Sequence, residues 1–400
     1  MTSAGTEPSS VGPAMSEHRP GDDRVAVSAA TLGFGLALGI GAVTLPLLAL
    51  AAGYELAVIG LLTASSAISQ LGVRLILPRV LSRYPDRALI TLACLMIAAS
   101  YGILLQTTAL PVFLIAQLLQ GAARGLFWTG SQTHVIRGPG GAVKSLAQNQ
   151  ILANLGTMSG PAIAGVLAAL SLSFAVQAGM VTGVAALVAS LALHRLPPFE
   201  RQPEGRPRRL WREPAVLAGC LANATAGGWR SMLGSYIPVI LSKAAVGPGV
   251  VGILVALADA ASVGAAALLA SYDPKHRQHA LRFGVLAIAT GLAILPFVAG
   301  EPIVAAFVLA LAGAGSGMVV VLGPALVIEA VEPAARGEAI ALSGTLRAVA
   351  LLGAPATVAL SLSFIPLAWA IVAVSLATAA PALLVGRRKS PVRVGRKSAS

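Results

Sequence analysis

The stretch QLLQGAARGLFW, residues 117–128, lies within an apolar run that extends over about residues 111–132 and contains an arginine, Arg124. A run of this length can cross a hydrocarbon core about 30 Å thick as a helix. The stretch LALAGAGSGMVV, residues 309–320, starts 192 positions later (117 and 309) and repeats the two glycines but not the arginine. We therefore expect a membrane-spanning helix that occurs in two related versions.

The composition excludes an ordinary soluble domain. Of the 400 residues, 56% are hydrophobic and 11% are charged, whereas soluble domains carry roughly 25% charged residues. Apolar runs of helix-spanning length recur from about residue 27 to residue 386. The strands of a membrane barrel would be about half as long and would alternate in polarity. The chain is therefore predicted to be an all-α membrane protein.

The apolar runs predict twelve transmembrane helices. They cover approximately residues 27–50, 57–77, 88–108, 111–132, 147–170, 172–193, 214–241, 249–271, 281–299, 302–328, 338–362 and 364–386. They form two six-helix bundles, 27–193 and 214–386, joined by a basic linker at 194–213. The polar tail 1–26 is expected to be disordered, and a basic tail follows at 387–400.

The net charge of +13 would suit a nucleic-acid-binding protein, but the distribution of the cations argues against one. Lysine and arginine lie in short loops between apolar spans, a pattern that sets orientation in a membrane. If both termini are cytoplasmic, 23 of the 28 cations lie on the cytoplasmic side, Lys243 lies outside and four fall within spans. We expect a multi-pass inner (plasma) membrane protein with no nucleic-acid partner.

The two halves show signs of internal duplication. Four residue pairs share an offset of 192 and one has an offset of 194. The pairs are Pro46 and Pro238, Gly60 and Gly252, Gly121 and Gly313, Gly125 and Gly317, and, at 194, Pro161 and Pro355. Because these pairs lie at equivalent depths in equivalent spans, we predict a repeated six-helix unit.

The fifth predicted span contains GTMSGPAIAG, residues 156–165. Gly156, Gly160, Pro161 and Gly165 match the antiporter motif G-x-x-x-G-P-x-x-G-G, with alanine in place of one glycine. Together with the twelve spans and the basic central linker, this motif resembles the major facilitator superfamily, and its drug/proton antiporters in particular. Small residues let helices approach closely and proline bends a span, so a gating role and ordinary tight packing both remain open.

Two other patterns of this family are incomplete. The motif R-x-x-Q-G of the fourth span appears as QLLQG, so that Gln117 takes the arginine position and Arg124 lies seven residues further on. The loop LPRVLSRYPDRALI keeps Arg83 and Arg87 but lacks the aspartate before the first arginine. We expect these two arginines to anchor the inner face of the protein.

Charged side chains within the spans are the candidate functional residues. A charge at the bilayer centre costs at least about 2.5–3.5 kcal/mol, so it normally faces protein or water. Arg124, Arg230 and Asp259 fall near mid-span, and Arg347 lies toward the cytoplasmic half. Arg74, near the inner end of its span, is expected only to extend toward the interface.

Helical spacing places several polar residues beside these charges. Gln117, Gln120, Arg124 and Trp128 share one face of the fourth span, and Asn223 and Arg230 share one face of the seventh. In the family that the chain resembles, these two spans line the central cavity. The resemblance therefore implies a substrate cavity formed by these six residues.

Two roles are open for Asp259, the only acid near mid-membrane. It either carries a proton between states or serves as a fixed counter-ion for Arg230 on the neighbouring span. Arg124 either contacts the substrate or a gate, or bonds to span-end carbonyls and water.

We expect a secondary transporter that exports a hydrophobic or amphiphilic, neutral or anionic small molecule in exchange for protons. Proton-coupled uptake of an organic anion is the alternative, and a non-transporting scaffold or lipid-handling protein is an alternative of another class. The expected partners are a small-molecule substrate, protons and the lipid bilayer, with the protein acting as a monomer. No Cys/His metal spacing or phosphate-binding loop appears in the sequence, so we expect no metal, no cofactor and no enzymatic activity.

Overall fold

The computed structural model describes residues 20–137, 142–198, 210–269, 277–332 and 335–384. Within these ranges all regular secondary structure is helical. The N-terminal half contains α1 (Pro20–Ala51), α2 (Leu56–Leu81), α3 (Asp86–Gln106), α4 (Leu110–Ile136), α5 (Ala142–Leu170) and α6 (Leu172–Leu191). The C-terminal half contains the short η1 (Leu210–Arg212), α7 (Pro214–Leu233), α8 (Tyr236–Lys243), α9 (Pro248–Leu269), α10 (Arg277–Val298), α11 (Pro302–Glu329), α12 (Arg336–Ser361), α13 (Leu367–Ala379) and α14 (Pro381–Leu384).

Ten of the described helices are long and apolar enough to cross a membrane. The two other predicted spans are each divided in the structure. The seventh consists of α7 and α8, and the twelfth consists of α13 and α14. The breaks lie close before Pro238 and Pro381, because a proline ring crowds the carbonyl four residues earlier and provides no N–H. The predicted all-α fold with two six-helix bundles is confirmed, with these two crossings divided.

One predicted boundary differs from the structure. Helix α1 begins at Pro20, so residues 20–26 are helical and not part of a disordered tail. Asp23 explains the earlier start, because its carboxylate accepts a hydrogen bond from the backbone N–H of His194. Residues 1–19, most of the linker 194–213 and the tail 387–400 lie outside the described residues.

The two halves repeat one packing scheme. On α4, Gly121 and Gly125 pack against Ser66 and Val73 of α2. On α11, Gly313 and Gly317 pack in the same way against Ala258 and Ser262 of α9. Since added Cβ atoms would meet neighbouring backbone or side-chain atoms at all four positions, the glycines allow two equivalent close helix crossings.

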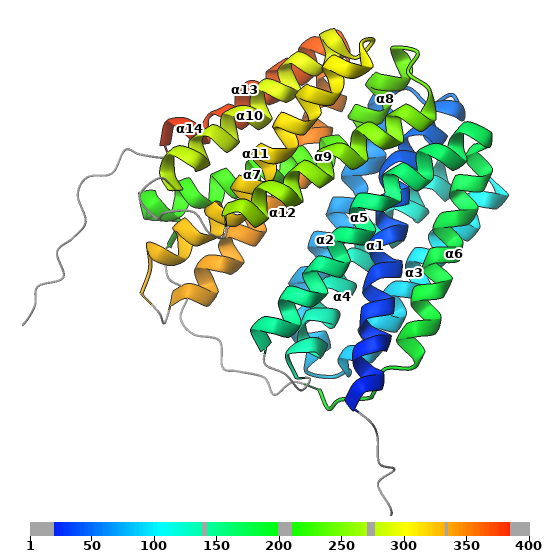
Figure 1. Cartoon of the computed structure of the whole chain (residues 1–400), viewed down its shortest axis with the longest axis vertical. Coiled ribbons are helices and arrows are strands. Elements are labelled where there is room, and N and C mark those ends of the chain that lie inside the picture. Colours follow the sequence, from blue (N-terminus) through cyan, green and yellow to red (C-terminus); the bar gives the residue numbers. More distant parts are fainter. Residues whose placement is uncertain (1–19, 138–141, 199–209, 270–276, 333–334, 385–400) are drawn as a thin grey trace, which may run out of the picture.

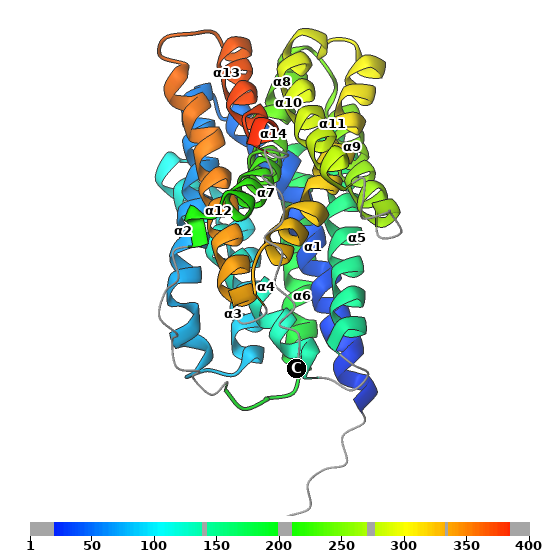
Figure 2. The ribbon, with the colours of Figure 1, turned by 90° about the vertical axis from the view of Figure 1, so that its left-hand side faces the viewer.

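The halves contact each other mainly at the end of the molecule where α2 begins and α5 ends. There α2 packs against α12, and α5 packs against α9. Figure 2 shows these two pairs on opposite sides of the interface. Gly60 lies against the backbone of Pro355, and Gly252 lies against that of Pro161. These contacts are related by the same internal repeat, so the closed end has approximate two-fold symmetry.

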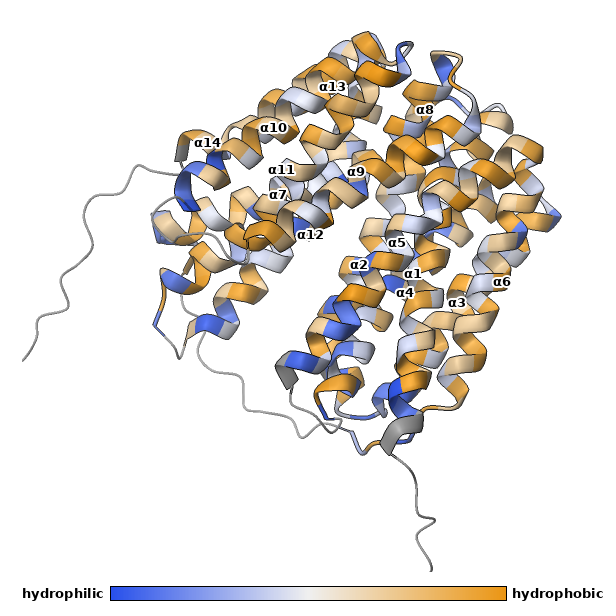
Figure 3. Cartoon of the chain, in the orientation of Figure 1, coloured by the Kyte–Doolittle hydropathy of each residue, from blue (hydrophilic) through white to orange (hydrophobic). Residues whose placement is uncertain are grey.

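From this closed end the halves diverge toward the end where α1 begins (Figure 1). Hydrophobic residues cover the flanks of both bundles, and hydrophilic residues concentrate at helix ends (Figure 3). Large apolar side chains on these flanks are exposed, for example Leu75 at 72% and Phe307 at 74%. Such surfaces fit a bilayer and not water.

Candidate substrate cavity

Arg124 projects from the middle of α4 and has few partners. Its Nη1 atom donates one long hydrogen bond of 3.4 Å to the hydroxyl of Ser66 on α2. Among the described residues no carboxylate forms an ion pair with it. An isolated guanidinium in an apolar setting is costly, and a bound anion would offset this cost. Arg124 is therefore a candidate anion-binding residue.

Arg230 on α7, by contrast, has a carboxylate partner. Its Nη1 atom lies 2.6 Å from Oδ1 and 2.9 Å from Oδ2 of Asp259 on α9. The side chains are 33% and 13% exposed, respectively, so the pair is shielded but still partly accessible. The structure shows the contact required by the counter-ion hypothesis, while a proton-carrying role of Asp259 requires this contact to open.

The guanidinium groups of both halves influence one another. Arg124 is within electrostatic range of Arg230, and Arg347 on α12 is within range of both Arg230 and Arg74 on α2. Four cations from the two halves therefore lie close enough to influence one another, and Asp259 balances one of them. Like charges repel unless a counter-ion lies between them.

Asn223 connects α7 to α12. Its amide nitrogen donates a 3.0 Å hydrogen bond to the hydroxyl of Ser343, and its carbonyl accepts a 3.4 Å bond from Nη1 of Arg347. The side chain is 5% exposed. Gly227, one turn further along α7, packs against the backbone of Arg347. Asn223 therefore positions Arg347, and little of its own surface is exposed.

The polar face predicted for α4 does not form one continuous wall. Gln120 is fully buried and donates a 3.2 Å hydrogen bond to the hydroxyl of Ser100 on α3. Gln117 is 6% exposed. Arg124 and Trp128 are the more accessible members of the face. The structure thus places both glutamines inside the N-terminal bundle, because α3 packs closely along this part of α4.

The antiporter-like motif on α5 contacts two different helices. Gly156 and Gly160 lie against α1, and an added Cβ at Gly160 would stand 2.6 Å from the backbone nitrogen of Ile40. Pro161 and Gly165 instead lie against Gly252 of α9, at the closed end. The motif therefore joins packing within one half to the contact between halves.

The two arginines predicted at the inner face differ in their contacts. Arg87 donates a 2.6 Å hydrogen bond from Nη2 to the carbonyl of Leu191 at the end of α6. Arg83 is exposed, and the described residues offer its side chain no partner. Of the two, only Arg87 joins helices.

Sequence reasoning missed a buried cluster of charged groups near Arg87. His134 of α4 lies 3.4 Å from Asp86 of α3 and 3.4 Å from Asp23 of α1. These residues are distant in the sequence and meet only because three helix ends converge. Their spacing therefore provided no signal.

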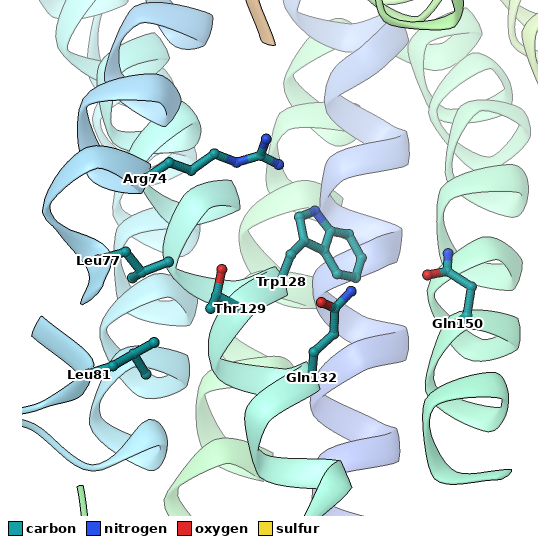
Figure 4. A pocket seen from close by; sticks show the side chains of 7 residues that line it. All are labelled: Arg74, Leu77, Leu81, Trp128, Thr129, Gln132 and Gln150. Carbon is teal, nitrogen blue, oxygen red and sulfur yellow. The ribbon is translucent and has the colours of Figure 1, made fainter. Parts of the chain in front are cut away.

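The role of Arg74 was also missed. It lines a pocket of about 570 Å³ in the wall of the open end, together with Trp128 and neighbouring polar and apolar residues (Figure 4). A signal was present, because Ser66, Gln70 and Arg74 are four residues apart and share one helix face.

This architecture can be compared with known proteins. The family model of the Major Facilitator Superfamily matches residues 27–355. The chain belongs to this superfamily. No curated protein sequence matches it significantly.

Among solved structures, the nucleoside transporter NupG has a TM-score of 0.71 at 12% identity, covering 92% of this chain and 99% of that one. A D-xylose–proton symporter has a TM-score of 0.71 at 14% identity, with coverages of 90% and 96%. A bacterial homologue of the human lysosomal transporter Spinster, inward-facing and unoccupied, has a TM-score of 0.67 at 13% identity, with coverages of 92% and 95%. At these identities the similarity shows the fold alone.

As a member of the major facilitator superfamily, the chain is a multi-pass membrane transport protein and not an enzyme. Proteins of this fold place their substrate sites near the bilayer midplane, at the interface of the two repeats. Arg124, Arg230 and Asp259 lie on helices that face this interface. They are the candidate substrate site.

Proposed function

We propose that this protein exports an amphiphilic organic anion in exchange for protons by alternating access. One observation carries the proposal. The interface between the halves carries several arginines, and Asp259 is the carboxylate paired with one of them, Arg230. A neutral amphiphile would fit the same apolar surroundings with lower affinity, and a strictly cationic compound would be repelled.

The arginines suit an anionic group because they come from both halves. Arg124 belongs to the N-terminal half, and Arg230 and Arg347 belong to the C-terminal half. A carboxylate, sulfonate or phosphate between them would accept hydrogen bonds from planar guanidinium groups. It would also offset their mutual repulsion, so binding would favour the approach of the two halves.

Export is favoured by the position of the motif on α5. Pro161 and Gly165 lie at the contact with α9, where the closed end must separate for the cavity to open to the other side. The glycines Gly156 and Gly160 allow α5 to move closely along α1. We propose that this helix acts in gating.

Proton-coupled uptake is the second candidate, and the ion pair favours it. A proton on Asp259 would release Arg230, which could then bind the anion. Proton and anion would in that case increase each other's affinity, because binding linkage is reciprocal. Such positive linkage drives symport, whereas export by antiport requires that proton and substrate bind alternately.

Transport in membrane vesicles tests both candidates. Decanesulfonate is a suitable probe because it stays ionised and does not carry protons across lipid as a weak acid does. In everted vesicles with an acidic interior, added decanesulfonate should release protons if the protein is an antiporter. Accumulation of decanesulfonate driven by an inward proton gradient, in right-side-out vesicles, would show symport instead.

Matched variants complete the transport experiment. Arg124→Ala and Asp259→Asn should lower the proton-coupled flux, while Arg79→Gln, an exposed arginine of α2 outside the cavity, should not. Fluxes that are absent for sulfonates, carboxylates and neutral amphiphiles alike would overturn the proposal. That result would favour a scaffold or lipid-handling role.

We also propose that both termini are cytoplasmic, in the inner membrane, and that the protein works as a monomer. The cation distribution supports this orientation. A single cysteine introduced in the 194–213 linker should react with a membrane-impermeant thiol reagent in everted vesicles. Reaction of this cysteine with the reagent from outside intact cells would show that the linker lies outside the cell, and it would contradict the proposed orientation.

A further inference from the structure

The pocket at the open end has the composition of a binding site for an amphiphile. Its volume of about 570 Å³ lies within the range of roughly 300–1,000 Å³ that is typical of small-molecule sites. It is formed by α2, α4 and α5 of the N-terminal half alone. The lining residues are Arg74, Leu77, Leu81, Trp128, Thr129, Gln132 and Gln150.

The charged end of this pocket is Arg74. Its guanidinium extends from α2 toward the indole of Trp128 (Figure 4). The side chain is exposed, and none of the described residues forms an ion pair with it. Since no acid lines the pocket, the ligand group that best suits Arg74 is an anion.

The remaining lining suits a single apolar tail. Leu77 and Leu81 follow Arg74 along α2, and Trp128 presents its indole from α4. The indole is held by edge-to-face contacts with Phe34 at 5.9 Å and Phe127 at 5.4 Å, measured between ring centroids. A fixed aromatic surface of this kind binds apolar groups at little cost in conformational entropy.

The pocket is connected to the candidate substrate site at Arg124 and Arg230 by a series of cations. Trp128 lies one helical turn from Arg124 on α4. Arg74 is within electrostatic range of Arg347, Arg347 of Arg230, and Arg230 of Arg124. An anionic group could therefore pass from one guanidinium to the next without entering a region free of positive charge.

We propose that this pocket is a second binding site, a vestibule site, for an amphiphilic anion. Arg74 holds the anionic head, and Trp128, Leu77 and Leu81 hold the tail before the head moves to Arg347, Arg230 and Arg124. The inference rests on the proposed transport of anions, but the binding itself can be tested without transport.

The test uses 11-(dansylamino)undecanoate, a fluorescent amphiphilic carboxylate, with the purified full-length protein in phosphatidylcholine nanodiscs. Bound probe should accept energy from tryptophan, and Trp128→Phe should reduce this transfer. Arg74→Gln should weaken the vestibule affinity about tenfold, as expected for loss of a charge-assisted hydrogen bond. Arg74→Lys should recover part of that loss, and Arg79→Gln on the same helix should leave the affinity unchanged.

Two comparisons separate the vestibule site from the central one. In Arg124→Ala the Arg74-dependent binding should persist, because the two sites are distinct. Loss of all binding in Arg124→Ala would overturn the vestibule site and leave the proposed function intact. Arg74-dependent binding of the probe to a protein that transports no anion would instead support the vestibule site and overturn the proposed function.

Two further results would contradict the inference. Equal affinity for the probe and for its neutral methyl ester would show that Arg74 binds no anionic head. Displacement of the probe by a modest fraction of phosphatidylglycerol in the nanodisc would assign the pocket to an anionic lipid and not to a transported compound.

Discussion

Arg124 and Arg230 are the same residue type near the middle of the two halves, yet they differ in their partners. Arg124 makes a single 3.4 Å hydrogen bond to Ser66, whereas Arg230 makes two short bonds to Asp259. The N-terminal half therefore offers a constant positive charge. The C-terminal half offers one that is balanced by a carboxylate.

The repeated scaffold makes this contrast informative. Glycine contacts recur at an offset of 192 in both halves, but the charges do not: the position equivalent to Arg124 is Ser316, and the position equivalent to Asp259 is Ala67. The charges are thus additions to a symmetric framework. A difference in charge between the halves did not require a change in the packing.

The largest expected effect is the loss of one partner of the ion pair. Asp259→Ala should lower the free energy of unfolding by about 2–3 kcal/mol, because Arg230 remains shielded without a counter-charge. The double variant Asp259→Ala/Arg230→Ala should recover most of the lost free energy of unfolding. Thermal unfolding in detergent measures both.

A control for this prediction is the surface pair of Arg277 and Glu329, whose closest atoms are 2.7 Å apart but whose side chains are 38% and 53% exposed. Glu329→Ala should cost less than about 1 kcal/mol. Equal losses in Asp259→Ala and Glu329→Ala would show that the Arg230 pair contributes no more than a surface contact.

Arg124→Ala should weaken ligand binding without destabilising the protein. With no carboxylate partner to lose, and with an uncompensated charge removed from an apolar setting, the protein should keep its stability or become more stable. Its affinity for decanesulfonate should fall about tenfold, and its affinity for decanol should stay unchanged. Titration by calorimetry in nanodiscs measures the binding. A large loss of stability would assign Arg124 a structural role.

Asp259→Asn should produce a smaller change, and one that depends on pH. If the protein works by symport, lowering the pH protonates Asp259 and frees Arg230, so decanesulfonate binding should strengthen, whereas export by antiport requires that it weaken. The amide mimics the protonated form, so at high pH the variant should differ from the wild type in the same direction, several-fold, with little further pH dependence. A variant that keeps the pH dependence of the wild type would show that another group takes up the proton.

Ser66→Ala should have the smallest effect. The bond to Arg124 is long, and its removal should change sulfonate affinity by less than about 1 kcal/mol. A loss as large as that of Arg124→Ala would mean that Ser66 is needed to orient the guanidinium. Ser65→Ala, which alters the neighbouring hydroxyl bonded to its own helix, is the matched control.

Much of the fold was accessible from the sequence because hydrophobic length and cation placement are local properties. Helix α5 was expected at 147–170 and is observed at Ala142–Leu170. The divided crossings were harder to predict, because Pro46 lies inside the continuous helix α1 while its equivalent, Pro238, follows a break. Whether a proline bends or breaks a span depends on what its neighbours can bond.

The candidate site was only partly accessible. Helical spacing placed Gln120 and Arg124 on one face, but in the structure Gln120 is buried against α3 while Arg124 stays partly accessible. Arg74 was expected merely to extend to the interface, yet it lines the vestibule pocket. A helical wheel shows which residues share a face, but it does not show which neighbouring helix covers that face.

The sequence by itself determined that this is a membrane protein of twelve crossings in two related halves, with cations where hydrocarbon-spanning segments rarely carry them. These features follow from composition and period, which act within each segment. Only the tertiary structure decided that Arg230 is paired with Asp259, that Arg124 has no carboxylate partner among the described residues and that Arg74 faces Trp128. Those contacts join segments far apart in the chain, and they depend on how closely the glycine-lined helices pack.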